Sequence, residues 1–307
     1  MVSELSKRFE GKFFIADIRQ PQVPLPPNVI YEYCDVRQPI PANLGGETSL
    51  VVDLAAIARE PGYPASAYYE TNVNGAKNIS EFCANVGIRA IWFTSTMSVY
   101  GPSEEPKPET AKPTPETPYG NSKIQAEEIY RAWQRQEAGR RLLIVRPAVI
   151  FGARDNGNFT KLARSLRQRM FVYPGRKDTI KACGYVEDLV NSLHFMDAQK
   201  EDYLVYNFAY PTPYTIEDIC NAFCEVAGFP RPWGMIPFPL MLAGSQVFKW
   251  LNELGIRNPI HPQRMYKLVR STYILPAELN QRGFRFHTDL KEGLRKWLLA
   301  EPVGEFI

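Results

Sequence analysis

The chain has 307 residues, of which 45% are hydrophobic and 22% charged, and its formal net charge is +3. This composition is ordinary for a soluble globular protein, and the length allows one large core and a second small lobe. Without a basic block, electrostatics gives no reason to expect nucleic acid as a partner. Five scattered cysteines without a Cys-x-x-Cys and three isolated histidines predict no metal site. A polar start and the lack of an apolar run of about 18 residues predict a reduced, cytoplasmic protein with no membrane partner.

Two short strands are predicted near the start, after residues 2–11, which look like the last turns of an amphipathic helix. The first strand, residues 12–17, closes on Asp17, and the second covers residues 29–36. In dinucleotide-binding folds an acid at a strand end hydrogen-bonds the adenosine ribose and repels a 2′-phosphate. Asp17 therefore favours NAD over NADP, although Arg19 weakens this preference. The alternative is that Asp17 only starts a turn.

Three segments lead into the middle of the chain. Residues 49–56 are a continuous apolar run of the kind found in parallel strands, and residues 69–86 have helical periodicity. Residues 90–96 predict a buried strand that ends in Thr94-Ser95-Thr96. Such a strand end presents hydroxyl groups where an open α/β sheet binds its ligands.

Tyr119 and Lys123 are four residues apart on a helix predicted over residues 119–138, so they lie on one face. A free tyrosine has a pKa near 10 and is a poor base at neutral pH. A neighbouring ammonium and a bound nicotinamide ring would both favour the phenolate and lower that pKa. Thr96 would hold a substrate oxygen beside the phenol. The alternative is a surface lysine one turn away from a partly buried tyrosine.

The next predicted strand, residues 141–146, runs into Pro147-Ala148-Val149-Ile150-Phe151-Gly152. The pattern is looser beyond this point, as expected of a second lobe. Residues 206–209 predict a short strand, and Thr215 caps a helix with acids in its first turn. Residues 236–254 are apolar at near-helical spacing, which fits the core of the lobe, a membrane-surface helix or the wall of a lipid pocket.

Four features together resemble the extended short-chain dehydrogenase/reductase family. They are the hydroxyl-ended strand, the Tyr119-x-x-x-Lys123 spacing, the Asn-x-x-Gly of residues 72–75 and the segment 147–152. They are most similar to its nucleotide-sugar epimerases, such as UDP-galactose 4-epimerase. The resemblance implies a doubly wound parallel α/β sheet, Rossmann-like, with a smaller C-terminal α/β substrate lobe. It places an NAD-binding domain at residues 1–152 and the lobe at residues 153–307. The strands expected to lie parallel in one sheet are those around Phe13, Ile30, Val51, Ile91 and Leu143.

The resemblance also implies roles for individual residues. Tyr119 is the catalytic acid/base, Lys123 is its activator and a ribose contact, and Thr96 is the hydroxyl of the site. The residues implied for binding NAD are Asp17, Asp35 and Val36 on the adenosine side, and Leu54, Ala55, Ala56, Asn72, Ser95, Tyr119, Lys123, Pro147, Ala148 and Val149. Those implied for the substrate are Thr96, Tyr119, Asn158, Lys181 (as the cation for a diphosphate) and Arg264, the last in a basic cluster with Lys267 and Arg270.

The chain departs from the family pattern in several places. No G-x-x-G-x-x-G or G-x-G-x-x-G occurs, although such a turn and the following helix N-terminus normally hold the pyrophosphate. The chain thus resembles a member without its first βα turn, through a mis-assigned start codon, a fragment or a degenerate homologue. The central first strand should then be absent and leave a gap in the sheet. Asp53 stands where relatives often have histidine, and Val149 stands where 4-epimerases have asparagine, so one substrate contact is absent.

The expected activity is that of an NAD-dependent epimerase or oxidoreductase acting on a hydroxyl-bearing carbon of a nucleotide sugar. Met97 and Ser98 occupy positions where dehydratases of the family usually carry an acid, which argues against a dehydratase. Two alternatives stay open. One is a hydroxysteroid-dehydrogenase-like enzyme for an apolar alcohol, and the other is a binding homologue whose catalysis is impaired by the missing turn.

A homodimer is also predicted, because family members usually pair through the helices near residues 72–86 and 119–138. A two-fold interface would need self-complementary apolar stripes on both helices. The alternative is that the apolar side chains on these helices all belong to the intramolecular core. The candidate side chains are Phe82, Ile124, Ile129 and Trp133.

Overall fold

A central parallel sheet organises the chain, and its four strands follow the order β10-β6-β4-β3. The computed structural model describes residues 11–60, 62–241, 268–301 and 306. In the ladder Val51 pairs with Ile91, and Ile91 pairs with Leu142, so the strands start level with one another. The strand bounds are β3 (Leu50–Asp53), β4 (Ala90–Thr94), β6 (Arg141–Pro147) and β10 (Tyr203–Phe208).

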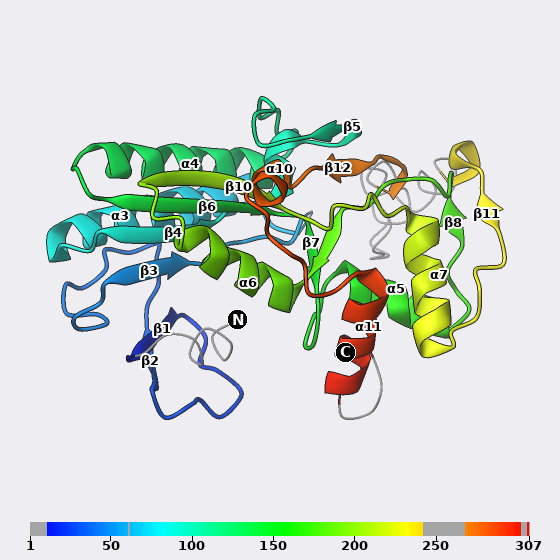
Figure 1. Ribbon diagram of the computed structural model, residues 1–307, viewed down its shortest axis with the longest axis horizontal. Helices are drawn as coiled ribbons and strands as arrows, with labels where there is room; N and C mark the ends of the chain where they lie inside the picture. The colour runs from blue at the N-terminus through cyan, green and yellow to red at the C-terminus, as the bar shows by residue number, and fades with distance from the viewer. Residues whose placement is uncertain (1–10, 61, 242–267, 302–305, 307) are drawn as a thin grey trace, which may run out of the picture.

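Helices cover both faces of this sheet, as Figure 1 shows. Ile91 and Phe93 of β4 pack in the cluster formed with α3 and α4, whereas Trp92 packs on the opposite face with α6. Successive side chains of a strand point to opposite faces, so β4 serves both layers. The doubly wound parallel fold predicted from the sequence is confirmed. The helix bounds are α3 (Asn74–Val86), α4 (Pro118–Arg135) and α6 (Val186–Asp197).

The two N-terminal strands are separate from the central sheet (Figure 1). β1 (Phe13–Asp17) and β2 (Val29–Tyr33) pair in parallel with each other alone. The prediction of one common sheet is therefore wrong for these two strands. Within the described residues no strand hydrogen-bonds to both β1 and β3, and without such a strand their ladders cannot join. Phe13 still packs against the cluster of buried residues on the α6 face of the sheet.

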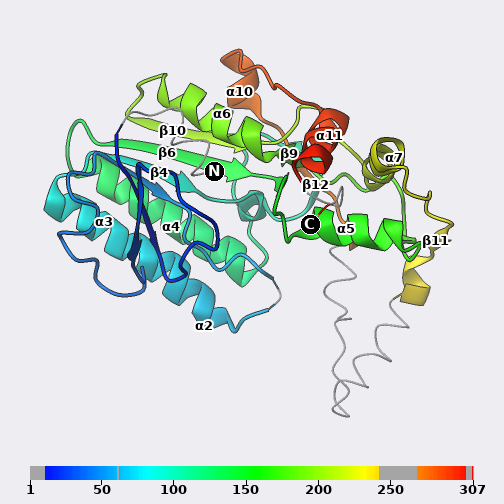
Figure 2. The same ribbon diagram turned by 90° about the horizontal axis from the view of Figure 1, so that it is seen from below.

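A lobe of helices and short strands lies beyond the carboxyl ends of the central strands (Figure 2). Its core is aromatic: the rings of Phe151 and Phe159 stack with centroids 4.5 Å apart, and Trp297 packs beside them. The helix predicted after Thr215 is confirmed, and a capping box closes its first turn. The lobe contains β7 (Val149–Phe151), α5 (Asn158–Arg167), β8 (Tyr173–Pro174), β9 (Cys183–Tyr185), α7 (Ile216–Ala227), β11 (Met235–Ile236) and α11 (Leu290–Ala300).

The chain crosses between lobe and sheet more than once, since α6 and β10 return to the sheet after β9. The division into domains at residue 152 stays a prediction. Residues 2–10 of the helix expected over residues 2–11, and residues 242–254 of the apolar segment, lie outside the described residues.

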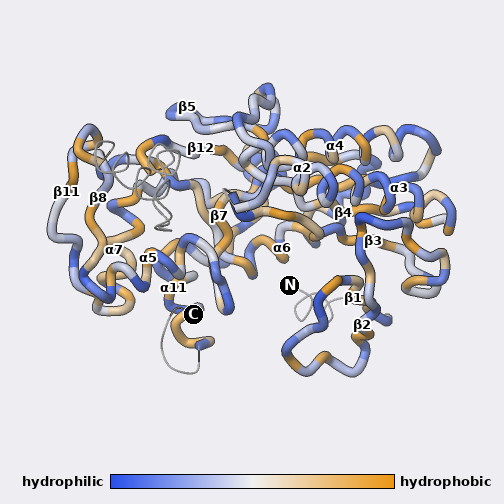
Figure 3. Tube along the Cα trace, turned by 180° about the vertical axis from the view of Figure 1, so that it is seen from behind, coloured by the Kyte–Doolittle hydropathy of each residue, from blue (hydrophilic) through white to orange (hydrophobic). Residues whose placement is uncertain are grey.

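Short elements lie between these layers. β5 pairs in parallel with β12, and Figure 3 shows that β5 and its flanks are hydrophilic. A π-helical turn, η1, interrupts the helix predicted over residues 69–86. None of the helices in the described part of the chain is long and apolar enough to cross a bilayer. The short elements are α2 (Ala65–Tyr68), η1 (Tyr69–Val73), η2 (Met97–Tyr100), β5 (Ser103–Lys107), β12 (Thr272–Ile274) and α10 (Ala277–Gln281).

The four side chains predicted for a dimer interface pack within the chain itself. Phe82 and Trp133 are buried in the cluster between the sheet and α3 and α4. Ile129 is partly buried against the same cluster, and Ile124 is partly buried against the cluster around Val99. Phe82 and Trp133 therefore belong to the intramolecular core, whereas Ile124 and Ile129 keep part of their surface exposed, and the homodimer stays a prediction.

A close packing at β9 gives a test of the fold. A Cβ atom added at Gly184 would lie 2.6 Å from a ring carbon of Phe208, which is fully buried on β10. We expect Gly184→Ala to lower the free energy of unfolding by about 1–3 kcal/mol in urea denaturation, because Phe208 must leave its rotamer. Gly234→Ala is the control, since nothing lies within 4 Å of its Cβ position. Equal stability of the two variants would contradict this packing.

Candidate active site

The polar side chains predicted to act together gather at the carboxyl end of β4. Thr96 follows this strand directly and caps η2, where its hydroxyl accepts a hydrogen bond from the Ser98 amide at 3.1 Å. The chain then passes through β5 and a loop to Thr117, which caps α4 by accepting from the Gly120 amide at 3.2 Å. Pro118 in the first turn suits this helix start because its amide would be unpaired there in any case.

A glycine brings the start of α4 against η2. A Cβ atom at Gly120 would lie only 2.5 Å from the carbonyl oxygen of Ser98. Because glycine has no Cβ, the first turn of α4 approaches the end of β4 closely. The neighbouring Tyr119 is thereby placed near Thr96, whose side chain acts to lower the pKa of the phenol.

The pKa of Tyr119 lies above its ordinary value. Burial of the phenol is the main cause, the charge of Glu60 adds to it, and the hydrogen bond with Thr96 acts in the opposite direction. The structure therefore does not show the predicted lowering of the Tyr119 pKa by Lys123. The direction is reversed because desolvation disfavours the phenolate, and the charged groups that interact with Lys123 lie elsewhere.

Lys123 is buried between α4 and the sheet, with 1% of its surface exposed. Its Nζ lies 4.1 Å from the centroid of the Phe93 ring. Burial lowers the pKa of Lys123 to about 8, while the charges of Asp53 and Glu127 act to raise it. Among the described residues no group accepts a hydrogen bond from this ammonium within 3.5 Å. An ammonium has three donors, so a ligand rich in hydroxyl groups, such as a ribose, fits this position.

Glu127, one turn further along α4, is fully buried and holds four hydrogen bonds. Its Oε1 accepts from Ser95 Oγ at 2.6 Å and from Arg146 Nε at 2.9 Å. Its Oε2 accepts from Arg146 at 2.7 Å and from Arg131 at 2.8 Å. Burial opposes the charge of Arg146, but the hydrogen bonds with Glu127 outweigh it and raise the pKa of Arg146. Sequence reasoning missed this pair, although Glu127 lies four residues after Lys123 and Arg146 ends an apolar run.

The network continues from Arg146 across the sheet. The Arg146 guanidinium donates to the Tyr100 hydroxyl at 2.7 Å, and Tyr100 donates to Asn207 of β10 at 2.9 Å. This chain of bonds joins α4, β6, η2 and β10. It fixes the helix that carries Tyr119 relative to the strand ends.

Asp53 closes the end of β3 with a buried carboxylate. Its Oδ2 accepts from the Tyr130 hydroxyl at 2.7 Å, and its Oδ1 accepts from the Ala55 amide at 2.9 Å. Burial raises the pKa of Asp53, whereas the charge of Lys123 acts to lower it. The following Leu54 and Ala56 are exposed, as residues that line a ligand site would be.

The residues predicted for the adenosine side lie around β1, β2 and the start of α3. Asp17 is exposed and accepts from the Arg19 amide at 2.8 Å, and Asp35 forms an ion pair with Arg37 that lowers its pKa. Val36 packs against Gly75, whose Cβ position lies 3.0 Å from it. The glycine of the Asn-x-x-Gly motif thus allows α3 to pass close to Val36.

Asn72 is buried and connects neighbouring elements. Its amide exchanges hydrogen bonds with the Ile57 backbone and donates to Ser122 of α4 at 2.8 Å. A contact of Asn72 with a cofactor stays a prediction.

Contacts of Ala148 and Val149, after the end of β6, with a cofactor also stay predictions. The amides of these two residues donate to the carbonyl oxygens of Phe208 and Ala182.

The residues predicted for the substrate are only partly brought together. Asn158 is exposed at the start of α5. Lys181, whose pKa burial lowers to about 8, donates from Nζ to the Arg270 carbonyl at 2.8 Å. The Arg270 guanidinium pairs with Glu116, immediately before the cap of α4, at 2.6 and 2.7 Å. Two of the four basic residues therefore meet near the Tyr119 helix, and Arg264 and Lys267 lie outside the described residues.

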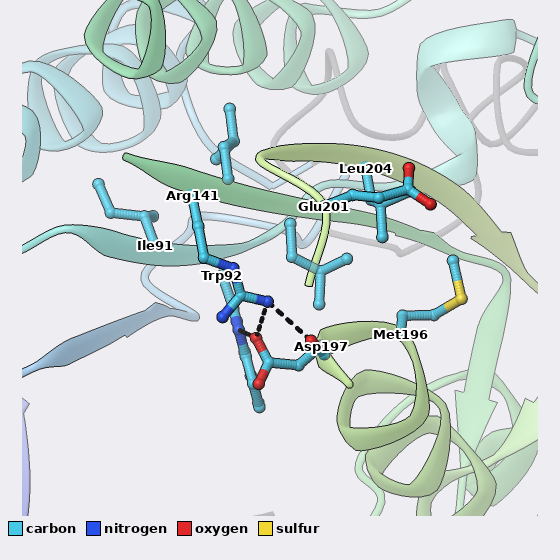
Figure 4. Close-up of a pocket in the computed structure, with 9 residues that line it drawn as sticks. Ile91, Trp92, Arg141, Met196, Asp197, Glu201 and Leu204 are labelled. Carbon is cyan, nitrogen blue, oxygen red and sulfur yellow. Dashed lines mark hydrogen bonds and ion pairs between the residues drawn. The ribbon is translucent and has the colours of Figure 1, made fainter. Parts of the chain in front are cut away.

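Two hollows elsewhere in the molecule do not serve this site. One, of about 10 Å³, lies at the amino ends of the strands, where Asp197 holds Arg141 at 3.0 Å and Trp92 at 3.2 Å (Figure 4). It has room for one water molecule at most. The other, of about 340 Å³, lies along β10. In its lining Arg282 pairs with Glu201 and Glu278, whereas Arg131 and Arg146 pair with Glu127.

A parallel sheet covered on both faces, with a hydroxyl, a phenol and a buried ammonium at the carboxyl ends of its strands, defines an α/β enzyme of the dinucleotide-binding class. The model of the NAD dependent epimerase/dehydratase family matches residues 44–209. The chain belongs to this family, whose members are enzymes, and the family predicted from the sequence is confirmed.

Named relatives extend over most of the chain. One is N-acetyl-alpha-D-glucosaminyl-diphospho-ditrans,octacis-undecaprenol 4-epimerase of Escherichia coli O157:H7, 30% identical over 256 residues, which are 82% of this chain and 77% of the relative. Another is UDP-glucose 4-epimerase 2 of Arabidopsis thaliana, 32% identical over 262 residues, with 77% and 69% covered.

Among solved structures, MoeE5 in complex with UDP-glucose and NAD superposes with a TM-score of 0.73 at 20% identity. The match covers 96% of this chain and 92% of MoeE5. A UDP-glucose 4-epimerase from Thermotoga maritima gives the same TM-score, identity and coverage. At this identity the likeness concerns the fold alone.

The Glu127–Arg146 pair gives a stability prediction. Arg146→Met should lower the free energy of unfolding by about 3–5 kcal/mol, because it leaves a buried carboxylate short of its main partner. The matched control is Arg89→Met, which breaks an exposed pair with Glu137 at 2.7 Å and should cost less than about 1 kcal/mol. Both values come from urea denaturation, and similar losses for the two variants would contradict the role assigned to the buried pair.

Proposed function

We propose that this chain is an NAD-dependent epimerase or simple oxidoreductase that acts on a hydroxyl-bearing carbon of a nucleotide sugar through Thr96, Tyr119 and Lys123. The observation that carries the proposal is the close approach of the start of α4 to η2 at Gly120, which brings Tyr119 to the end of β4, with the buried ammonium of Lys123 one helical turn away. Membership of the NAD-dependent epimerase/dehydratase family supports both the cofactor and the reaction class.

The protein's own groups divide the proton transfer between them. When bound, NAD supplies the hydride chemistry. Tyr119 exchanges a proton between its phenol oxygen and the sugar hydroxyl, and Thr96 orients that hydroxyl. Because burial raises its pKa, Tyr119 rests as the neutral phenol. Lowering a tyrosine pKa by about three units takes roughly 4 kcal/mol, and hydrogen bonding by Thr96 acts in that direction.

The described residues fit the two riboses of NAD better than its pyrophosphate. Lys123 has unused donors for the nicotinamide ribose, and Asp17 is an exposed acceptor for the adenosine ribose. For the pyrophosphate, the described residues provide no glycine-rich turn between a strand and a helix. A binding homologue with impaired catalysis is therefore the alternative that this feature favours. Isothermal titration with NAD separates the two, because micromolar binding is expected only of the enzyme.

The substrate side favours a diphosphate over an apolar alcohol. Lys181 and Arg270 place two basic residues beside the loop that leads into α4. A second candidate is a sugar carried on a polyprenyl diphosphate, since the Escherichia coli relative acts on such a compound by its name. Exposed apolar side chains around β11 favour it, namely Trp233, Met235, Ile236 and Leu240. Parallel assays with UDP-sugars and with a polyprenyl diphosphate sugar distinguish the two substrates.

Homodimerisation and a cytoplasmic location remain predictions. Phe82 and Trp133 are buried in the core, so of the four side chains first considered only Ile124 and Ile129 are left for a two-fold interface, with other residues of α3 and α4. Sedimentation equilibrium tests the dimer. A single species of 35.0 kDa at micromolar concentration would contradict it.

Tyr119→Phe tests the assigned acid/base. The variant removes one hydroxyl, so turnover should fall at least about 100-fold while the dissociation constant for NAD changes by less than about threefold. Tyr68→Phe is the matched control, because the ring of this buried tyrosine lies 6.3 Å from the Tyr119 ring and its hydroxyl donates to the backbone carbonyl of Arg59. Turnover that survives in Tyr119→Phe removes Tyr119 from the mechanism.

A further inference from the structure

Two carboxylates act on the buried ammonium of Lys123, and they differ in how far they are already paired. Glu127 accepts four hydrogen bonds, and three of these come from the cations Arg146 and Arg131. The two positive charges of Arg146 and Arg131 therefore already balance the negative charge of Glu127, without Lys123. Within the described part of the chain, Asp53 accepts only from the neutral Tyr130 hydroxyl and the Ala55 amide. Asp53 is thus the carboxylate whose charge is left for Lys123.

The backbone places Asp53 next to the ring on which Lys123 lies. Asp53 of β3 is the register partner of Phe93 of β4, and Lys123 Nζ lies 4.1 Å from the centroid of that ring. Tyr130, which bonds to Asp53, packs on the same ring with centroids 4.7 Å apart. The two hydrogen bonds to Asp53 hold its carboxylate toward α4. The ammonium, the ring and the carboxylate therefore form one buried cluster between β3, β4 and α4.

We propose that Asp53 is a positioning residue that holds the Lys123 ammonium over Phe93, charged and ready to bind a ribose. The link to catalysis rests on the proposed function of Lys123. The link between Asp53 and Lys123 does not, and it is measured separately below. An ammonium in an apolar site tends to lose its proton. Removal of the Asp53 carboxylate should therefore lower the pH at which Lys123 becomes neutral.

Lys123 titrates at a lower pH than Cys83 and Tyr130, which face the same cluster. Asp53 faces it from β3, Glu127 and Tyr130 face it from α4, and Cys83 faces it from α3. Burial raises the pKa of Cys83 to about 12 and also raises that of Tyr130, so both stay neutral near pH 8. Lysine is charged below its pKa, and the pKa of Lys123 is about 8. Activity that needs the ammonium should therefore fall as the pH rises through that value.

The direct test is an NMR titration of the protein labelled with 13C at the lysine ε carbons, with the Lys123 signal assigned from Lys123→Gln. In Asp53→Asn the midpoint of this signal should move down by about one pH unit or more, as expected on loss of an opposite charge. Asp53→Glu, which keeps the carboxylate, should restore most of the shift. The matched control is Asp197→Asn, which removes a carboxylate at the other end of the sheet (Figure 4) and should leave the midpoint unchanged.

The pH profile of turnover is the second readout. With a midpoint one unit lower, Asp53→Asn should turn over at nearly the wild-type rate at pH 6 and about fivefold more slowly at pH 8. If Asp53→Asn does not fold, Asp53→Ser supplies the neutral variant. An unchanged Lys123 midpoint in a folded neutral variant overturns the proposal, whatever the activity. A shifted midpoint in a protein without turnover supports the positioning role and counts against the proposed function instead.

Discussion

The carboxylate of Glu127 has no exposed surface, and an unpaired charge inside a protein is costly, so its position is decided by the donors around it. These donors come from Ser95 at the end of β4, from Arg146 on β6 and from Arg131 on α4. Because two of them belong to strand ends, the ion pair fixes where α4 crosses the sheet. An apolar replacement of such a pair can be as stable, so its contribution here is to register more than to stability.

Once α4 is fixed at Glu127, the positions one and two turns earlier follow from helix geometry. Lys123 falls over the face of β4, and Tyr119 falls at its carboxyl end beside Thr96. Gly120 permits the remaining approach to η2, because any side chain there would collide with the Ser98 carbonyl. The site is therefore assembled by one helix face and one strand end, which explains why residues far apart in the sequence meet with few loop contacts between them.

The sequence predicted the features that depend on local spacing and missed those that depend on long-range pairing. The hydroxyl-ended strand and the helix with Tyr119 and Lys123 follow from periodicity, and the structure confirms both elements. The separation of β1 and β2 from the central sheet, and the pairing of Glu127 with Arg146, involve partners that no periodicity identifies. The sequence also did not predict that the pKa of Tyr119 is raised, because desolvation sets this direction and residue spacing carries no information on burial.

Burial pushes the two central groups of the site toward their neutral forms, since it raises the pKa of Tyr119 and lowers that of Lys123 from 10.5 to about 8. For Lys123 the difference corresponds to about 3 kcal/mol against folding at neutral pH, a cost that disappears as the pH rises from about 8 to 10.5. The same helix offsets this cost on its other turns, where Tyr130 and Trp133 are buried in the main core. α4 therefore carries both the packing that holds the fold, through Tyr130 and Trp133, and the buried charge of Lys123. Asp53 connects the two, because its carboxylate accepts a hydrogen bond from Tyr130 and its charge acts to raise the pKa of Lys123.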